Sequence, residues 1–230
     1  MSRKQRNPNR PAQSGPDAGE QQEGPTGRPL LMTFVKNPVP GRVKTRLAQT
    51  TGNDFAADIY RRLLRHTREV ASSAGIPVQV WYSDRIEPDD LWGDVGFPKR
   101  LQRGDHLGQR LESAFEDAFA EGYVPVIVIG SDCPGIRAWH IEQAMQQLRN
   151  YDLVLGPSQD GGYYLLGLNR PAADLFREMP WSKDGLLEET VRSAERLGLN
   201  PAYLEPLNDI DTEEDLDSLN ALPGQKEEGR

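Results

Sequence analysis

VIVIGSDCPGI, residues 126–136, joins a run of branched aliphatic residues to an abruptly polar turn. The run is continuous from Val126 to Ile129, as is typical of a central parallel strand that is buried on both faces. Ligands of open α/β sheets bind just outside the carboxyl ends of the strands, so Asp132 lies where a substrate is expected. The same residue could instead cap a helix that begins near Arg137, and the spacing alone does not separate the two interpretations.

On both sides of this strand, short apolar runs alternate with longer amphipathic stretches. This alternation indicates βαβ units around a mostly parallel sheet, and therefore an α/β fold. Residues 54–74, for example, carry an apolar stripe with the period of a helix that faces the sheet, at Phe55, Ile59, Leu63, Thr67 and Val70. The other expected strands are 30–35, 78–83, 152–156, 162–168 and 202–204, and the other expected helices are 107–120, 137–149, one within 180–198, one beginning near Val43 and one beginning near Thr212.

The terminal segments differ in composition from the residues between them. Residues 1–28 contain no aromatic or branched aliphatic side chain and are rich in Pro, Gly, Gln and Arg, so they cannot bury enough surface to offset the entropy of ordering. We therefore predict a disordered tail over 1–28, a single domain over 29–222 and a second disordered tail over 223–230.

Charge and apolar content exclude several classes of protein. The formal net charge is −8, whereas general nucleic-acid binding needs clustered cations. The longest apolar run, 124–129, is far too short to span a membrane. The single cysteine, Cys133, excludes an intramolecular disulfide, and no histidine lies close enough in the sequence to suggest an activated nucleophile. We expect a cytoplasmic protein without nucleic-acid or membrane partners, and either a monomer or a homodimer.

The segment PVPGRVKTRL, residues 38–47, has the features of an anion site. Pro40 and Gly41 stiffen the loop after the first strand, and the helix that follows begins with Arg42, Lys44 and Arg46. Free amides at a helix N-terminus and nearby cations together bind phosphate. The alternative is a solvated basic helix start, which the helix dipole disfavours unless an anion compensates.

The segment GPSQDGGYYLLGL, residues 156–168, predicts two strands joined by a tight turn. Gly161 and Gly162 would let the backbone approach a ligand closely, with Asp160 beside it. A plain hairpin turn explains the same residues equally well.

Two aspartates near the end of the chain form a further candidate site, in NDIDTEED, residues 208–215. Asp209 and Asp211 lie two residues apart, so in an extended chain both carboxylates project from one face and can share a hard cation such as Mg²⁺. The alternative is a capping cluster, with Asp211 or Thr212 as the N-cap. If both converge with Asp132, repulsion between unit charges about 4 Å apart costs about 4 kcal/mol at an effective dielectric constant near 20, so a cation or a proton must intervene.

Four motifs in order, PVPGRVKTRLA, GSDCPGI, GPSQDGGYYLLGL and DIDTEEDL, resemble the DUF2064 family over nearly all of residues 29–220. This resemblance implies a GT-A fold, which is a Rossmann-like three-layer sandwich with a mostly parallel central sheet. The family is also named among glycosyltransferases of arsenosugar biosynthesis.

The same motif order is similar to that of the 2-phospholactate and molybdenum-cofactor guanylyltransferases. In those enzymes the residues that match Lys44 and Arg46 contact the nucleotide, and those that match Asp132, Asp209 and Asp211 hold magnesium and substrate phosphate. The resemblance therefore implies a Mg²⁺ or Mn²⁺ site at these three aspartates. Two segments depart from the relatives: Cys133-Pro134 stands in place of Leu-Pro, and PWSKDGLL, residues 180–187, differs from the expected Trp-Ser/Gly-Thr pattern.

Two chemistries fit these residues, and both use a nucleotide donor and a small-molecule acceptor. In nucleotidyl transfer an acceptor phosphate attacks an NTP and pyrophosphate leaves, so Lys44 and Arg46 would neutralise the triphosphate. In glycosyl transfer from a nucleotide sugar, Asp160 would activate the acceptor hydroxyl. The basic segment favours nucleotidyl transfer, and a non-catalytic nucleotide-binding protein is a third interpretation. We expect catalytic roles for Lys44, Arg46, Asp132 and Asp160, and nucleotide contacts from Pro40, Gly41, Arg42, Lys44, Arg46, Ser131, Gly161 and Gly162.

Overall fold

The computed structural model describes residues 27–181 and 185–221. The tails predicted for 1–28 and 223–230 lie almost wholly outside these ranges. Arg28 is an exception, because it begins the first strand, β1 (Arg28–Val35), so the folded part starts slightly before the predicted boundary. No helix within the two described ranges is both long enough and apolar enough to cross a membrane.

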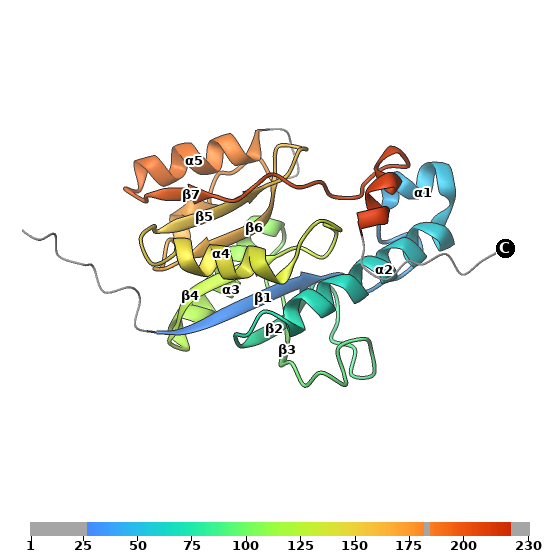
Figure 1. The fold of residues 1–230 in the computed structure, drawn as a ribbon, viewed down its shortest axis with the longest axis horizontal. Helices are drawn as coiled ribbons and strands as arrows, with labels where there is room; N and C mark the ends of the chain where they lie inside the picture. The colour runs from blue at the N-terminus through green and yellow to red at the C-terminus, as the bar shows by residue number, and fades with distance from the viewer. Residues whose placement is uncertain (1–26, 182–184, 222–230) are drawn as a thin grey trace, which may run out of the picture.

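The described strands form one sheet in the order β3-β2-β1-β4-β6-β5-β7 (Figure 1). The pairs β3-β2, β2-β1, β1-β4 and β5-β7 are parallel, whereas β6 is antiparallel to both β4 and β5. The predicted mostly parallel sheet is therefore confirmed. The edge strand β3 was missed because two of its three residues, Lys99 and Arg100, are charged, so the segment shows no apolar pattern. The remaining bounds are β2 (Val78–Tyr82), β3 (Lys99–Leu101), β4 (Tyr123–Ile129), β5 (Leu153–Pro157), β6 (Tyr163–Leu168) and β7 (Pro201–Tyr203).

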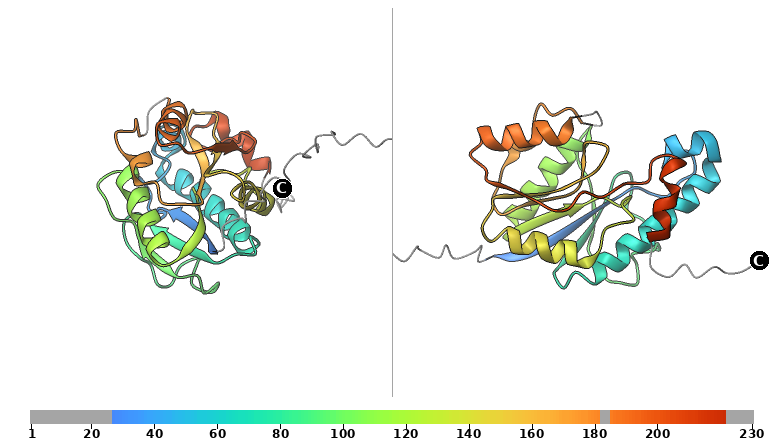
Figure 2. Two further views of the ribbon diagram at one scale, coloured as in Figure 1. Left: turned by 90° about the vertical axis from the view of Figure 1, so that its left-hand side faces the viewer. Right: turned by 45° about the horizontal axis from the view of Figure 1, so that its top comes forward.

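Helices cover both faces of the sheet, because side chains along each strand alternate between two cores. In β4, Ile127 and Ile129 enter the core beneath α2 and α4, whereas Val126 and Val128 enter the core beneath α3 and α5. The result is the expected three-layer α/β sandwich (Figures 1 and 2). The helices are α1 (Thr45–Thr51), α2 (Asn53–Ser72), α3 (Leu107–Ala120), α4 (Ala138–Gln147) and α5 (Leu186–Arg196), and the 3-10 helices are η1 (Ala173–Phe176) and η2 (Glu214–Ala221).

Helix α2 faces the sheet with only part of the predicted stripe, because Val70 enters the core beneath the sheet and other members of the stripe do not. Tyr60 and Leu64 enter the core beneath the sheet. Ile59 and Leu63 instead belong to a separate cluster with the C-terminal segment, and Phe55 is 45% exposed. The apolar surface of α2 is wide enough to serve two neighbours, and the periodicity did not show which part met the sheet.

The segment that follows β7 returns across the molecule to α1 and α2 (Figure 2). Ile210 is fully buried there, in a cluster that also contains Leu47 and Leu219. The backbone N–H of Ile210 donates to the carbonyl oxygen of Asp132 at 3.2 Å. This segment therefore brings both of its candidate aspartates, Asp209 and Asp211, to the carboxyl end of β4.

The helix that closes the described chain begins slightly later than predicted. It is a 3-10 helix, η2, and it begins at Glu214 rather than near Thr212. The Asp215 carboxylate accepts the N–H groups of Asp211 and Thr212, at 2.9 and 2.7 Å. Asp215 thus reaches back from the first turn of the helix to residues that precede it, and no hydrogen bond of this kind engages the Asp211 carboxylate, which contacts Lys44 and Arg46 instead.

Candidate active site

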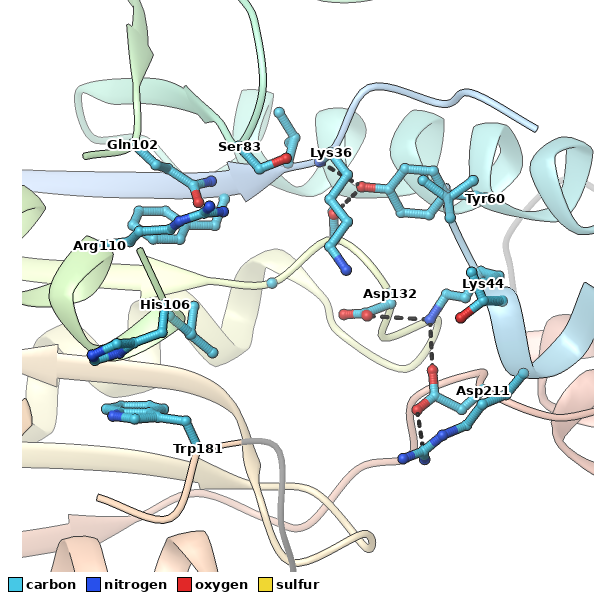
Figure 3. Close-up of a pocket in the computed structure, with 18 of the residues that line it drawn as sticks. Lys36, Lys44, Tyr60, Ser83, Gln102, His106, Arg110, Asp132, Trp181 and Asp211 are labelled. Atoms are coloured by element: carbon cyan, nitrogen blue, oxygen red, sulfur yellow. Dashed lines mark hydrogen bonds and ion pairs between the residues drawn. The ribbon is translucent and has the colours of Figure 1, made fainter. Parts of the chain in front are cut away.

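A cavity of about 740 Å³ opens at the carboxyl ends of β1 and β4 (Figure 3). Its walls also include the start of α1, the start of α3 and the C-terminal segment. This is the edge of the sheet at which a substrate was expected. We name two parts of it. The carboxylate end is lined by Lys36, Lys44, Arg46, Asp132 and Asp211, and the aromatic end is lined by Gln102, His106, Arg110 and Trp181.

Lys44 forms the centre of the carboxylate end. Its Nζ lies 3.1 Å from Asp132 Oδ2 and 3.1 Å from Asp211 Oδ1. The backbone of Lys44 is left-handed (φ 46°, ψ 47°), which delays the start of α1 from the predicted Val43 to Thr45. Burial alone would lower the pKa of Lys44, but the two carboxylates outweigh it and hold this pKa above its ordinary value. Lys44 is therefore a buried, charged counter-ion, with only 5% of its side chain exposed.

Asp132 and Asp211 converge on Lys44, whereas Asp209 is absent from the lining formed by the described residues but lies near enough to both to be affected by their charge. Burial would raise the pKa of Asp132, but Lys44 holds it below its ordinary value. For Asp209, burial and then the charge of Asp132 raise the pKa to about 8. That carboxyl therefore keeps a proton at neutral pH, while the ammonium of Lys44 bridges the other two.

The three aspartates fit a hard divalent cation in their chemistry, because carboxylate oxygens are the ligands that Mg²⁺ and Mn²⁺ prefer. Asp209 Oδ1 is also buried without a hydrogen-bond partner in the described part of the chain. The positions of these side chains are less suitable for a metal ion than their chemistry. Within the described ranges, no group of three or more His, Cys, Asp or Glu side chains is placed to hold a metal ion. The position between Asp132 and Asp211 is taken by Lys44 Nζ instead.

The rest of the basic segment divides between the cavity and the solvent. Arg46 lines the cavity, and its Nη1 lies 3.6 Å from Asp211 Oδ2. Pro40, Gly41 and Arg42 form an exposed turn that contributes nothing to the lining defined by the described residues. Arg42 pairs with the exposed Asp84 at 3.4 Å. The expected nucleotide contacts of this turn stay predictions.

Asp160 stabilises its own turn and does not line the cavity formed by the described residues. Its Oδ1 accepts hydrogen bonds from the Ser158 hydroxyl and from the Gly162 N–H, the second at 3.0 Å. Gly161 has a φ of 83°, a conformation that favours glycine. Among the described residues, this turn supplies none of the cavity lining. The hairpin interpretation accounts for these contacts, although Asp160 lies near enough to contribute to the raised pKa of Asp209.

Cys133 is buried beneath the same turn that carries Asp132, with 3% of its surface exposed. Burial raises the pKa of its thiol far above the ordinary range. The thiol therefore stays protonated, which agrees with the prediction that Cys133 is not a nucleophile.

Tyr60 joins the two strand ends that carry the site, and the sequence pattern missed it. Its hydroxyl accepts the Lys36 N–H at 2.9 Å and lies 2.8 Å from Ser131 Oγ. Burial raises the pKa of Tyr60 to about 12, so the hydroxyl stays neutral. Ser131, an expected nucleotide contact, lines the cavity and is bonded to this tyrosine. Tyr60 belongs to the part of α2 adjacent to the predicted stripe, and only its tertiary contacts distinguish it.

The aromatic end was not predicted either, because its residues come from separate segments that carry no motif. The Trp181 ring packs directly on Gly108 of α3: a Cβ at that glycine would lie 2.1 Å from Trp181 Nε1. Gln102 Nε2 donates to the carbonyl of Trp81 at 2.8 Å, and Arg110 Nε donates to the carbonyl of Gly104 at 3.0 Å. Trp181 belongs to the 180–187 segment that departs from the relatives, of which residues 182–184 lie outside the described ranges.

Comparisons with known proteins identify the family of this chain. A family model described as "Uncharacterized protein conserved in bacteria (DUF2064)" matches residues 66–183. The 2-phospho-L-lactate guanylyltransferase of Methanocaldococcus jannaschii is 34% identical over 177 residues, which cover 77% of this chain and 76% of that protein.

Solved structures also share the fold. A nucleotide-diphospho-sugar transferase from Desulfovibrio desulfuricans G20 has a TM-score of 0.74 and 31% identity, with 81% of this chain and 84% of that chain covered. Rv0371C of Mycobacterium tuberculosis H37Rv, solved as a complex with manganese, has a TM-score of 0.52 and 13% identity, with coverage of 83% and 97%. The second likeness concerns the fold alone. This protein therefore belongs to the DUF2064 family, as a GT-A-like transferase homologous to guanylyltransferases.

Proposed function

We propose that this protein transfers a nucleotidyl group from an NTP to a small phosphorylated acceptor and releases pyrophosphate. The observation that carries the proposal is the cavity at the ends of β1 and β4, in which three cations, Lys36, Lys44 and Arg46, surround the carboxylates of Asp132 and Asp211. Its volume of about 740 Å³ is suitable for a nucleotide. The homology to guanylyltransferases supports the same reaction class.

In this reaction an oxygen of the acceptor phosphate attacks the α-phosphorus of the NTP. A new P–O bond forms, the bond to the oxygen bridging the α- and β-phosphates breaks, and pyrophosphate leaves with the bonding electrons. Negative charge grows on the leaving group, so fixed cations lower the barrier. Lys44 and Arg46 would bind the triphosphate, with Lys36 on the opposite side of the carboxylate end.

We further propose that Asp132 and Asp211, with Asp209 beside them, hold Mg²⁺ or Mn²⁺ when the nucleotide is bound. The ion would act as a Lewis acid on the phosphate oxygens. The manganese complex of the structurally similar Rv0371C supports a divalent cation in this fold. We propose a cytoplasmic location for the reaction.

The aromatic end would hold the nucleoside. Trp181 offers a flat apolar surface, and Gln102 and Arg110 offer hydrogen-bond donors about the other side of the cavity (Figure 3). Bases are commonly held by aromatic surfaces together with a few polar groups. The triphosphate would then extend toward Lys44 at the opposite end.

Glycosyl transfer is the second candidate, and the similarity to a nucleotide-diphospho-sugar transferase favours it. It would require an acceptor base, for which the sequence offered Asp160. The Asp160 carboxylate is engaged in its own turn, which does not line the cavity formed by the described residues. This placement favours nucleotidyl transfer.

A donor panel tests the proposal directly. The protein is incubated with the four NTPs or with nucleotide sugars, a mixture of small phosphorylated acceptors, and Mg²⁺ or Mn²⁺. We expect pyrophosphate release with at least one NTP. Release of nucleoside diphosphate from sugar donors, with no pyrophosphate from any NTP, would establish glycosyl transfer instead. Thermal stabilisation by nucleotides without turnover of either kind would indicate a binding protein.

A further inference from the structure

We propose that Lys44 and the divalent cation compete for the same two carboxylates, so that the protein binds metal tightly only when nucleotide phosphate draws Lys44 away. This inference rests on the proposed function, because it assumes that Asp132 and Asp211 hold the metal. It goes further in stating that metal and nucleotide enter the site together.

The ammonium group of Lys44 lies between the two carboxylates. Lys44 Nζ lies 3.1 Å from an oxygen of each carboxylate, and it approaches them from the protein side, with only 5% of its side chain exposed. Asp132 and Asp211 keep 43% and 41% of their side chains exposed. A divalent cation held by both of these oxygens would have to lie between them, which is where Nζ lies. Two cations cannot share that space without strong repulsion.

Two further cationic side chains lie near the two carboxylates. Arg46 Nη1 lies 3.6 Å from Asp211 Oδ2, and Lys36 lines the same end of the cavity. With Lys44 in place, the two carboxylates therefore face three cationic side chains. Their negative charge is already neutralised, and a free divalent cation gains little by binding.

Lys44 has an alternative partner when a nucleotide is bound, namely the phosphate oxygens. Its side chain reaches the cavity from the N-terminal boundary of α1, where a single residue has left-handed backbone. Rotation of the side chain alone can move the ammonium along the wall toward the cavity space. A triphosphate in that space offers anionic oxygens to Lys44 while the carboxylates pass to the metal. A ligand shifts such an equilibrium only by its different affinity for the two arrangements, and here phosphate and metal favour the same one.

The test is a titration of the full-length protein with Mn²⁺, followed by electron paramagnetic resonance of the free ion, without any nucleotide. Wild type is compared with Lys44→Met and Lys44→Gln. Arg103→Met is the control, because it removes one positive charge from a residue that pairs with Asp117 and does not line the cavity. We expect Lys44→Met and Lys44→Gln to bind Mn²⁺ at least about tenfold more tightly than wild type, and Arg103→Met to differ from wild type by less than about threefold.

A non-hydrolysable NTP analogue completes the design. It should raise the Mn²⁺ affinity of wild type much more than that of Lys44→Met, whose carboxylates are already available. Circular dichroism establishes which variants are folded. If Lys44→Met does not fold, the comparison is made with Lys44→Gln, which keeps a hydrogen-bond donor.

Two results would overturn the inference, and they differ in what they say about the proposed function. If a folded Lys44 variant binds Mn²⁺ no more tightly than wild type, while wild type releases pyrophosphate from an NTP, competition is rejected and the proposed reaction stands. If no variant binds Mn²⁺ with or without the analogue, the metal site and the competition are both rejected.

Discussion

Asp132 and Asp160 both follow strands of the same sheet, and their partners lie at very different distances along the chain. Asp132 is bonded to Lys44, 88 positions away, in a cluster that also includes Asp211. Asp160 is bonded to Ser158 and Gly162, each two positions away. Local partners stabilise a turn wherever it occurs in a protein, whereas partners from three distant segments meet only in the folded cavity. The comparison separates a structural aspartate from a candidate catalytic one.

The largest expected effect is that of Asp132→Asn. This change keeps the shape of the side chain but removes the charge that pairs with Lys44 and would hold the metal. We expect kcat for pyrophosphate release to fall by roughly 10³-fold, the scale seen when one strong electrostatic contact to a transition state is lost. A steady-state assay at saturating Mg²⁺ measures it. A loss below about tenfold would place the reaction elsewhere in the molecule.

Arg110→Ala should affect nucleotide binding rather than chemistry. The side chain lines the aromatic end, away from the carboxylates. We therefore expect the KM for the NTP to rise by roughly 10- to 100-fold, with a small change in kcat. A rise of this size corresponds to the loss of one charged hydrogen bond. Arg103→Ala is the control, because Arg103 pairs with Asp117 on the surface and does not line the cavity. Equal effects of the two substitutions would contradict a nucleoside site at this end.

Lys44→Met should destabilise the fold, because it leaves two carboxylates facing each other without their cation. We expect a loss of about 1–3 kcal/mol in the free energy of unfolding, between the values for buried and exposed pairs, since each carboxylate is partly exposed. Denaturant titrations near pH 7 measure the loss. An unchanged stability would mean that the pair contributes nothing to the fold.

The same difference between wild type and Lys44→Met should depend on pH in a defined way. The pKa of Asp132 is held below its ordinary 3.8, so its contribution is present above that pH and is lost as pH falls. The pKa of Lys44 is held above 10.5, so its contribution is present below that pH and is lost as pH rises further. We therefore expect a constant difference between about pH 5 and 7, and a smaller one below about pH 4. Lys44 lowers the pKa of Asp209, which is about 8, so the difference should grow above about pH 8. Unfolding curves across this range check it, and a steady slope between about pH 5 and 7 would implicate other groups.

The smallest expected effect is that of Asp160→Asn. Asparagine keeps an acceptor oxygen for Ser158 and Gly162, so the turn should persist and kcat should change by less than about threefold. Glycosyl transfer with Asp160 as the base instead requires a loss of at least about 10²-fold. Pyrophosphate release from an NTP and nucleoside-diphosphate release from a sugar donor, both measured on this variant, distinguish these outcomes.

The sequence predicted the parts of the fold and site that depend on local pattern. The apolar run of β4 and its polar end placed Asp132 correctly, and the motif GPSQDGGYYLLGL predicted the β5-β6 hairpin. Electrostatics also predicted that converging aspartates need a cation or a proton. It could not show that Lys44 is the cation, because no spacing rule relates residues 44, 132 and 211. Tyr60 and Trp181 were missed for the same reason, since their importance lies wholly in tertiary contacts.

The anchoring of Ile210 between α1 and α2 also bears on how the protein is made. Asp211 follows the last strand, β7, so a polypeptide emerging from the ribosome exposes every strand of the sheet before it exposes this carboxylate. The nascent chain already contains Lys44 and Asp132, but it lacks the residue that completes their cluster until Ile210 docks in its cluster. The cluster that we propose for nucleotide and metal binding is consequently completed only after every described strand of the sheet has been synthesised.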